Sequence, residues 1–313
     1  MKNFKTIGIC GIGQMGASAA IAFKRAGYRV LLWARDPNKL RELGETTASQ
    51  PPNSAPGAWE AAAPRAGGEI VLESNLARLD AQADAVLECI IEVMEEKVAL
   101  LKRLENCRRR GALLMSVTSG LSITEMGRGS DTEALLVGAH FWNPPHLIPL
   151  VEMVAGPATP AAMFEAACEL ISDIGKVPVR CKDVPGFIGN RLMHAMWREA
   201  LALVDAGVCS AEDIDRVVKF TFALRLPVLG PMENMDLVGL DAAERIQRYL
   251  CPALAKNDAP ARCLSDKVKA GELGMKSGQG FYDWRQRDAN RTIVDRDRQI
   301  ARQLEFLREI GQL

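Results

Sequence analysis

His140 is the residue in this sequence best placed for acid–base chemistry. It follows directly on the apolar run 135–139, and Glu152 comes 12 residues later, after a second apolar run. Histidine exchanges protons near neutral pH, and a carboxylate can orient the ring and stabilise its charged form. Such a pair can take the proton of an alcohol while a hydride leaves for a nicotinamide. A lone histidine is more often structural, but a position at the end of a predicted strand favours a ligand site.

A glycine-rich loop, Gly11-Ile12-Gly13-Gln14-Met15-Gly16, follows the apolar run 6–10 and precedes a helical pattern. The first glycine allows a tight turn, the second lets the backbone approach a pyrophosphate, and the third allows close helix–strand packing. An isolated motif of this kind is weak evidence, but a second apolar run at 29–33 follows at the spacing of a βαβ unit. The loop therefore predicts dinucleotide binding, with a structural turn or an FAD site as alternatives. The contacts expected here are Gly11, Gly13, Gln14, Met15 and Gly16.

The end of the second predicted strand bears on the choice of cofactor. An acidic residue there would bind the ribose hydroxyls of NAD, but the sequence has Ala34 followed by Arg35. A small residue and an arginine favour the 2′-phosphate of NADP. The alternative is NAD, with Arg35 stacked on the adenine and Asp36 turned toward the ribose.

The elements that must position these residues fall into two parts. Strands are predicted at 6–10, 29–33, 85–91, 113–117 and 135–139, with helices at 15–26 and 95–108. This alternation predicts an α/β Rossmann amino-terminal domain with a mostly parallel, doubly wound sheet, at 1–185. From residue 186 the strand signals fade, so 186–313 is predicted as an all-α domain with a capping box at Ser210–Asp213 and a charged helical tail from Asp288. A surface loop is expected at 45–57.

Composition excludes several classes of function. Lys plus Arg equals Asp plus Glu at 39 each, so no net charge points to nucleic acid or a membrane surface. The 8 cysteines form no Cys-x-x-Cys pair, so we expect neither a disulfide framework nor a zinc site. The amino-terminal apolar run is broken by glycines, which fits a strand and turn better than a signal peptide. We expect a cytoplasmic protein without a metal.

Longer stretches carry a specific resemblance, namely 140–144, 183–191, 230–241 and 278–282. Over nearly the whole chain, the sequence resembles the L-3-hydroxyacyl-CoA dehydrogenase superfamily, which includes relatives acting on gulonate, carnitine and pyridine carboxylates. The resemblance implies His140 as general acid and base, Glu152 as its partner, Ser119 at the reacting oxygen, Asn190 at the substrate carbonyl, Asn143 at the nicotinamide ribose, and Glu92 and Lys97 lining the cofactor cleft; Ser119 is expected at the cofactor as well. Ser119 and Asn190 could instead be helix caps, and Glu92 and Lys97 ordinary helix charges.

The resemblance also implies the reaction and the assembly. We expect NAD(P)-dependent interconversion of a 3-hydroxyacyl-CoA, or of a small β-hydroxy acid, with its 3-keto form. The alternatives are a dehydrogenase of an aromatic or other small carboxylate alcohol or aldehyde, and a dinucleotide-binding protein without turnover. The family's lysine-rich CoA-binding hairpin is missing, since only Lys39, Arg41 and Arg65 offer charge there, and Val117 replaces the family's asparagine. A homodimer formed through the helical domain is expected.

Overall fold

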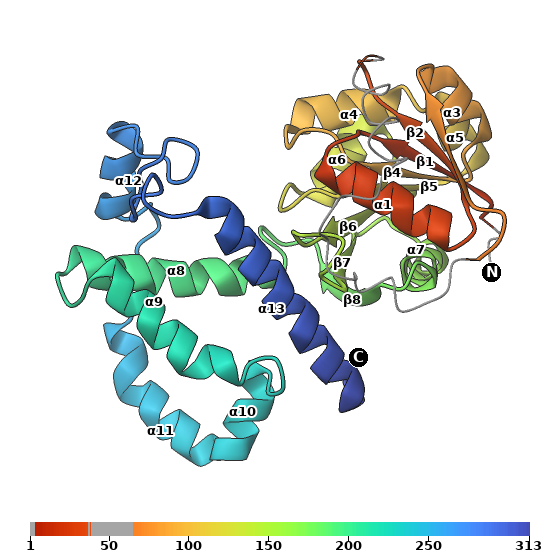
Figure 1. Cartoon of the computed structure of the whole chain (residues 1–313). Helices are drawn as coiled ribbons and strands as arrows, with labels where there is room; N and C mark the ends of the chain where they lie inside the picture. The colour runs from red at the N-terminus through yellow and green to blue at the C-terminus, as the bar shows by residue number, and fades with distance from the viewer. Residues whose placement is uncertain (1–3, 37, 39–64) are drawn as a thin grey trace. The chain divides into compact units, whose positions relative to one another are not determined.

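The computed structural model describes residues 4–36, 38 and 65–313, and the chain divides into two compact units, Met1–Arg191 and Leu192–Leu313. The predicted loop at 45–57 lies outside the described residues, as do Lys39 and Arg41. Each unit has its own architecture (Figure 1).

The amino-terminal unit is built on an eight-stranded sheet in the order β3-β2-β1-β4-β5-β6-β7-β8. Neighbouring strands are parallel except for the antiparallel pair β6 and β7. This confirms the predicted mostly parallel Rossmann-type sheet. The strands are β1 (Thr6–Cys10), β2 (Arg29–Trp33), β3 (Glu69–Glu73), β4 (Ala85–Glu88), β5 (Leu113–Ser116), β6 (Leu136–Phe141), β7 (Leu150–Ala155) and β8 (Val177–Lys182).

Helices cover both faces of this sheet. On one face, α1 (Gln14–Arg25) and α7 (Ala161–Asp173) pack apolar side chains such as Phe23 and Ile171 against the strands. On the other face lie the other helices of the described part of this unit, with a second core cluster beneath them. These are α3 (Leu76–Gln82), α4 (Met94–Lys102), α5 (Glu105–Arg110) and α6 (Ile123–Ser130). The central strands are buried on both faces, as parallel strands between two helical layers must be.

The carboxyl-terminal unit is helical, which confirms the predicted change of fold class. Its capping box is present, since Ser210 Oγ accepts from the Asp213 backbone N–H at 3.1 Å. The helices are α8 (Gly189–Asp205), α9 (Ala211–Phe220), α10 (Pro231–Val238), α11 (Leu240–Leu250), α12 (Arg262–Lys269) and α13 (Ala289–Glu309), with short 3-10 turns at Phe222–Leu224 and Cys251–Ala253.

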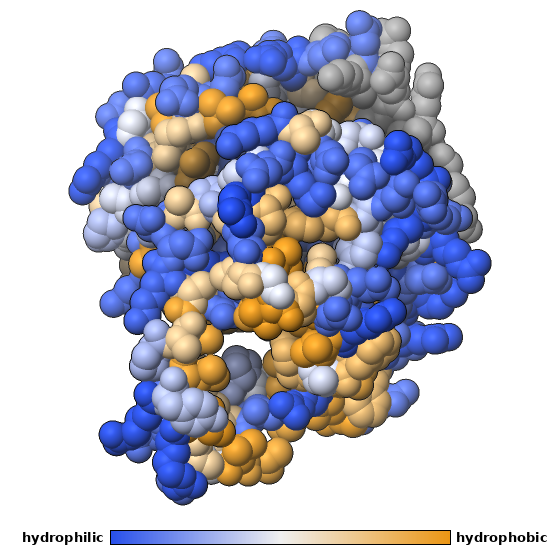
Figure 2. Space-filling view, turned by 90° about the vertical axis from the view of Figure 1, so that its left-hand side faces the viewer, coloured by the Kyte–Doolittle hydropathy of each residue, from blue (hydrophilic) through white to orange (hydrophobic). Residues whose placement is uncertain are grey.

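Large apolar side chains remain on the surface of this helical unit. None of the helices α8 to α12 contains a buried residue, and hydrophobic residues gather on the face shown in Figure 2. The most exposed include Phe220, Leu224 and Leu237. Among the described residues, no helix combines the length and the apolar character needed to cross a bilayer.

Candidate active site

The centre of the site is a buried histidine–carboxylate pair on two neighbouring strands. His140 on β6 and Glu152 on β7 are directly opposite in the antiparallel register. The His140 Nδ1 atom lies 2.7 Å from Glu152 Oε2, and the two residues are 5% and 1% exposed. An ionised carboxylate can only accept, so Nδ1 carries the hydrogen and Nε2 is left to exchange a proton. The pair can therefore act as an oriented acid–base group.

Glu152 is held from three further directions. Its Oε1 accepts hydrogen bonds of 2.9 Å from the backbone N–H groups of Ile188 and Gly189, where α8 begins. Its Oε2 also accepts from Trp142 Nε1 at 3.2 Å. Burial alone would raise the pKa of Glu152, but the hydrogen bonds from His140, Gly189 and Ile188 hold this pKa below its ordinary value. The carboxylate is thus kept ionised at neutral pH.

The imidazole of His140 is enclosed by aromatic rings. The ring centroids of Trp142 and Phe187 lie 5.2 Å and 5.8 Å from that of His140. Phe187 is buried and has a φ of 50°, a left-handed conformation that turns the chain from β8 into α8. Sequence reasoning did not single out Trp142 or Phe187, because an aromatic residue beside a histidine carries no signal distinct from core packing.

Ser119 and Asn190 meet beside this pair. Ser119 follows the carboxyl end of β5. The neighbouring strand β6 is parallel to β5, and His140 lies at its carboxyl end. Asn190 Nδ2 donates to the Ser119 carbonyl oxygen at 2.7 Å. Within the described part of the chain, the exposed Ser119 hydroxyl has no hydrogen-bond partner. The turn that holds Glu152 therefore also holds Ser119, so the four residues predicted to carry chemistry form one connected set.

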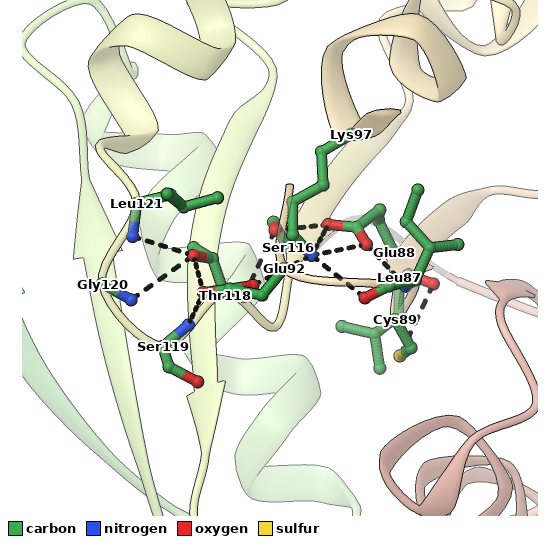
Figure 3. A network of polar contacts seen from close by, with 11 residues as sticks. Leu87, Glu88, Cys89, Glu92, Lys97, Ser116, Thr118, Ser119, Gly120 and Leu121 are labelled. Carbon is green, nitrogen blue, oxygen red and sulfur yellow. Dashed lines mark hydrogen bonds and ion pairs between the residues drawn. The ribbon is translucent and has the colours of Figure 1, made fainter. Parts of the chain in front are cut away.

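A buried polar network lies under Ser119 (Figure 3). Glu92 Oε1 accepts from the Ser119 backbone N–H at 2.6 Å and from Thr118 Oγ1 at 2.7 Å. Lys97 Nζ lies 3.4 Å from Glu92 Oε2 and donates to both oxygens of Glu88, at 2.8 Å and 2.9 Å. Lys97 and Glu88 are both 0% exposed. The structure thus brings Glu92 to Ser119 as a backbone acceptor, and it places Lys97 beneath Glu92 as a buried counter-charge.

Glu88 and Ser116 are members of this network that sequence reasoning missed. Ser116 Oγ donates to Glu88 Oε2 at 2.5 Å, and the Ile90 backbone N–H donates to Glu88 Oε1 at 2.7 Å. Glu88 ends β4 in the apolar run 85–91. A charged residue inside a predicted buried strand was the one sequence signal that could have indicated a buried partner for it.

The glycine loop has the shape that a pyrophosphate needs. Gly11 has a φ of 119°, and a Cβ there would lie 2.4 Å from the carbonyl oxygen of Cys89. A Cβ on Gly16 would lie 2.0 Å from the Gly11 carbonyl oxygen, so both positions require glycine. Gly13 is the N-cap of α1, with open space where a Cβ would stand and no side-chain cap. The first turn of α1 contains no acidic residue, so its N–H groups suit an anion and the loop fits a dinucleotide.

The predicted cofactor-selecting residues follow β2. Ala34 is buried, whereas the Arg35 side chain is 83% exposed and its Nη1 lies 3.8 Å from Glu96 Oε2. Asp36 Oδ1 accepts from the Asn38 backbone N–H at 2.9 Å. A carboxylate therefore stands beside the only cation expected to bind a 2′-phosphate.

Asn143 lies on the loop that follows β6. It is exposed and is joined to Pro144 by a cis peptide bond. Beneath the loop, the buried Lys176 donates from Nζ to the carbonyl oxygens of Pro145 at 2.7 Å and Ile148 at 2.6 Å. In the residues that the structure describes, Asn143 makes no hydrogen bond with His140, Glu152, Ser119 or Asn190. Among the described residues, no group of three or more His, Cys, Asp or Glu side chains could hold a metal ion.

Comparison with known proteins agrees with this architecture. Residues 6–184 match the family model for the NAD binding domain of 3-hydroxyacyl-CoA dehydrogenase, and residues 186–284 match the model for its C-terminal domain. The chain is 30% identical over 305 residues to 5-formyl-3-hydroxy-2-methylpyridine 4-carboxylate 5-dehydrogenase of Mesorhizobium japonicum, covering 95% of this chain and 96% of that protein. It is 34% identical over 286 residues to 3-hydroxybutyryl-CoA dehydrogenase of Bradyrhizobium diazoefficiens, covering 90% and 96%.

Two solved structures give the same picture. The NAD+-dependent dismutase described as 5-formyl-3-hydroxy-2-methylpyridine 4-carboxylic acid 5-dehydrogenase superposes with a TM-score of 0.85 at 29% identity, covering 97% of this chain and 99% of that one. A (S)-3-hydroxybutyryl-CoA dehydrogenase from Ralstonia eutropha gives a TM-score of 0.70 at 28% identity, covering 90% and 99%. The chain therefore belongs to the 3-hydroxyacyl-CoA dehydrogenase family and is an NAD-dependent dehydrogenase of that family.

Proposed function

We propose that this enzyme oxidises a small carboxylate-bearing alcohol or aldehyde with NAD+, using His140 as the acid–base group. The observation that carries the proposal is the 2.7 Å contact between His140 Nδ1 and Glu152 Oε2, which leaves the Nε2 atom to face the reacting oxygen. The NAD+ bound at the glycine loop would supply a hydride acceptor. Ser119 and Asn190 would hold the oxygen from which His140 takes the proton.

The proton follows a short path in this mechanism. His140 Nε2 accepts the hydroxyl proton of an alcohol, or of the hydrate of an aldehyde, as the C–H electron pair leaves as hydride. The imidazolium that forms is stabilised by Glu152, whose charge is already fixed by two backbone N–H groups and Trp142. In the reverse direction the imidazolium returns the proton to the carbonyl oxygen. Phe187 and Trp142 limit the access of water to the ring.

NAD is the cofactor that we propose, in place of the NADP favoured by the Ala34-Arg35 pair in the sequence. Glu96 lies 3.8 Å from the Arg35 guanidinium, and its carboxylate would repel a ribose 2′-phosphate. The family model is that of an NAD binding domain, and the dismutase with a TM-score of 0.85 is described as NAD+ dependent.

The substrate class rests on two observations. The TM-score of 0.85 to the pyridine-carboxylate enzyme exceeds the 0.70 to the 3-hydroxybutyryl-CoA enzyme. Of the few cations between β2 and β3, Arg65 already donates to both oxygens of Asp173 at 2.9 Å, so it is engaged within the protein. The first observation favours an aromatic carboxylate, and the second argues against a CoA thioester. A 3-hydroxyacyl-CoA is the second candidate, because the 34% identity to a 3-hydroxybutyryl-CoA dehydrogenase supports it.

A substrate panel tests this order. NADH formation would be followed at saturating NAD+ with a formyl- or hydroxymethyl-pyridine carboxylate, 3-hydroxybutyrate and 3-hydroxybutyryl-CoA. We expect kcat/KM for the pyridine carboxylate to exceed that for the thioester by at least about tenfold, the ratio that ~1.4 kcal/mol of transition-state binding gives. A thioester preferred by the same factor would replace the first candidate with the second.

We also propose that the enzyme is a homodimer joined through the helical unit. In Leu192–Leu313, Leu304 is the one buried hydrophobic residue, while Phe220, Leu237 and Tyr249 are about 70% exposed. A helical unit of this size needs a buried core, and a second copy of the same apolar surface would supply it. Light scattering after size exclusion should give twice the 34.1 kDa chain mass. A monomeric mass at micromolar concentration would contradict the proposal.

A further inference from the structure

The cluster of Glu88, Glu92 and Lys97 contains one more negative charge than positive charge. Lys97 Nζ makes its short contacts with the fully buried Glu88 and a longer one, 3.4 Å, with Glu92. The Glu92 side chain is 43% exposed, so the excess charge faces the outside of the cluster at this residue. Among the described residues, Lys97 is the only cation within ion-pair distance of Glu92.

This excess charge lies at the edge of the sheet where the cofactor binds in such folds. Glu88 ends β4, which pairs with β1 so that Glu88 is opposite Cys10, directly before the glycine loop. Glu92 bonds the Ser119 backbone N–H at 2.6 Å, and Ser119 is tied through Asn190 to the turn that holds Glu152. Ligands occupy the crevice at the carboxyl ends of the strands, where the order reverses between β1 and β4. For hydride transfer, the nicotinamide must lie beside the substrate carbon and therefore near Ser119.

We propose that the Glu92 carboxylate, positioned by Lys97, makes this enzyme bind the oxidised cofactor more tightly, relative to the reduced one, than it otherwise would. The oxidised nicotinamide ring is cationic and the reduced ring is neutral, whereas the rest of the dinucleotide has the same charge in both forms. A nearby carboxylate therefore lowers the free energy of the oxidised complex selectively. The inference rests on the proposed function, and it adds a role for Glu92 in setting which redox form the enzyme holds.

Lys97 is a positioning residue in this arrangement. Its side chain is fully buried, so its ammonium affects the site only through its ion pairs with Glu92 and Glu88. Its strongest contacts neutralise Glu88, which leaves Glu92 only partly compensated. Removing Lys97 would leave Glu88 as an unpaired buried charge and damage the fold, so Glu92 is the better residue to change.

Glu92→Gln changes the charge and keeps the contact. The glutamine oxygen can still accept from Thr118 Oγ1 and from the Ser119 N–H, while the cluster becomes neutral overall. Glu92→Asp keeps the charge and shortens the reach. Glu95→Gln is the matched control, because Glu95 is an exposed acid in the first turn of α4, the helix that begins two residues after Glu92.

The test is to measure the dissociation constants of NAD+ and NADH by calorimetry for the wild type and the three variants. For Glu92→Gln, we expect the ratio of the NAD+ constant to the NADH constant to rise about three- to tenfold, as one carboxylate at partly screened range gives. The ratio should change less than about twofold in Glu95→Gln and Glu92→Asp. An unchanged ratio in Glu92→Gln, with thermal melting showing a folded protein, overturns the inference and leaves the proposed function intact. A wild type that binds neither dinucleotide overturns both.

Discussion

Replacing Glu152 by glutamine tests whether the orientation of His140 is what makes the site work. The glutamine oxygen would take the place of Oε1, because the N–H groups of Ile188 and Gly189 require an acceptor there. The amide NH2 would then face His140 Nδ1, which must become an acceptor. The ring hydrogen would move to Nε2, and the atom that should take the substrate proton would already carry one.

The size of the effect follows from what is lost. A histidine locked in the wrong tautomer loses about 10⁴-fold in kcat, the magnitude known for the corresponding change in serine proteases. The imidazolium also loses its counter-charge, while Trp142 Nε1 at 3.2 Å loses an acceptor. Removing a hydrogen bond to a charged group costs about 1.5–3 kcal/mol of unfolding free energy. We therefore expect a large loss of kcat and a moderate loss of stability.

The assay is steady-state NADH formation with the preferred substrate of the panel, paired with urea unfolding. Glu169→Gln is the control, since Glu169 is an exposed acid on α7 and the substitution makes the same change of charge. Glu152→Asp keeps the charge at shorter reach and should fall between wild type and Glu152→Gln. A folded Glu152→Gln enzyme that keeps more than about one tenth of wild-type kcat/KM would refute the tautomer argument.

Three further outcomes are expected. Glu96 lies 3.8 Å from the Arg35 guanidinium, so we expect the wild type to prefer NAD over NADP in kcat/KM and Arg35→Ala to keep that preference. A wild type that prefers NADP, and loses this preference in Arg35→Ala, would reverse the cofactor proposal. Burial lowers the pKa of Lys176 from 10.5 to about 7, so between these pH values the unfolded chain binds one more proton than the folded chain. In urea titrations, the stability of wild type relative to Lys176→Met should therefore rise with pH by up to about 1.4 kcal/mol per pH unit. A difference that does not change with pH would argue against a neutral buried amine. A Cβ at Gly189 would lie 2.2 Å from Trp142 Cζ2, so Gly189→Ala should lower the unfolding free energy by about 1–3 kcal/mol in the same titrations.

The architecture was largely predictable because, in the first half of the chain, the hydrophobic periodicity and the positions of the turn residues indicate the same strands and helices. The strands at 6–10 and 29–33 were predicted with their observed bounds, since Gly11 directly follows the first and Gly27 shortly precedes the second. The predicted helix at 95–108 is interrupted at Arg103 and Leu104, where α4 ends and α5 begins. No propensity signal marks that break, which depends on Leu104 packing into the core.

Three strands were not predicted at all, and each has a physical reason. β3 (Glu69–Glu73) begins and ends with glutamate, and β8 (Val177–Lys182) is a polar strand at the other edge of the sheet. Edge strands bury one side and tolerate charge, so their hydrophobic pattern is weak. β7 (Leu150–Ala155) is apolar except for Glu152, whose charge interrupts the pattern, and its short connection from β6 fits the antiparallel return.

In the candidate site too, the sequence predicted some residues and their roles, whereas other contacts form only in the folded chain and were not predicted. His140 and Glu152 could be paired from the sequence because a catalytic histidine is commonly oriented by a carboxylate. Lys97 could be named but not placed, because a lysine on a helix is usually solvated, and burial is affordable here only because Glu88 meets it. Glu88 itself looked like part of a strand. Partners that are distant in sequence and meet only after folding leave no local pattern.

Glu152 also explains why the acid–base pair is ready before any substrate arrives. The first turn of α8 contains no acidic side chain, so its unsatisfied N–H groups need an anion, and Glu152 Oε1 supplies it from another strand. The hydrogen bonds from His140, Gly189 and Ile188 together hold the pKa of Glu152 below its ordinary value, so the helix N–H groups add to the effect of the imidazole. A carboxylate held only by His140 would be free to rotate or to take up a proton when the imidazole is neutral. Because the helix fixes one oxygen, the other oxygen stays aimed at Nδ1 through the whole proton cycle.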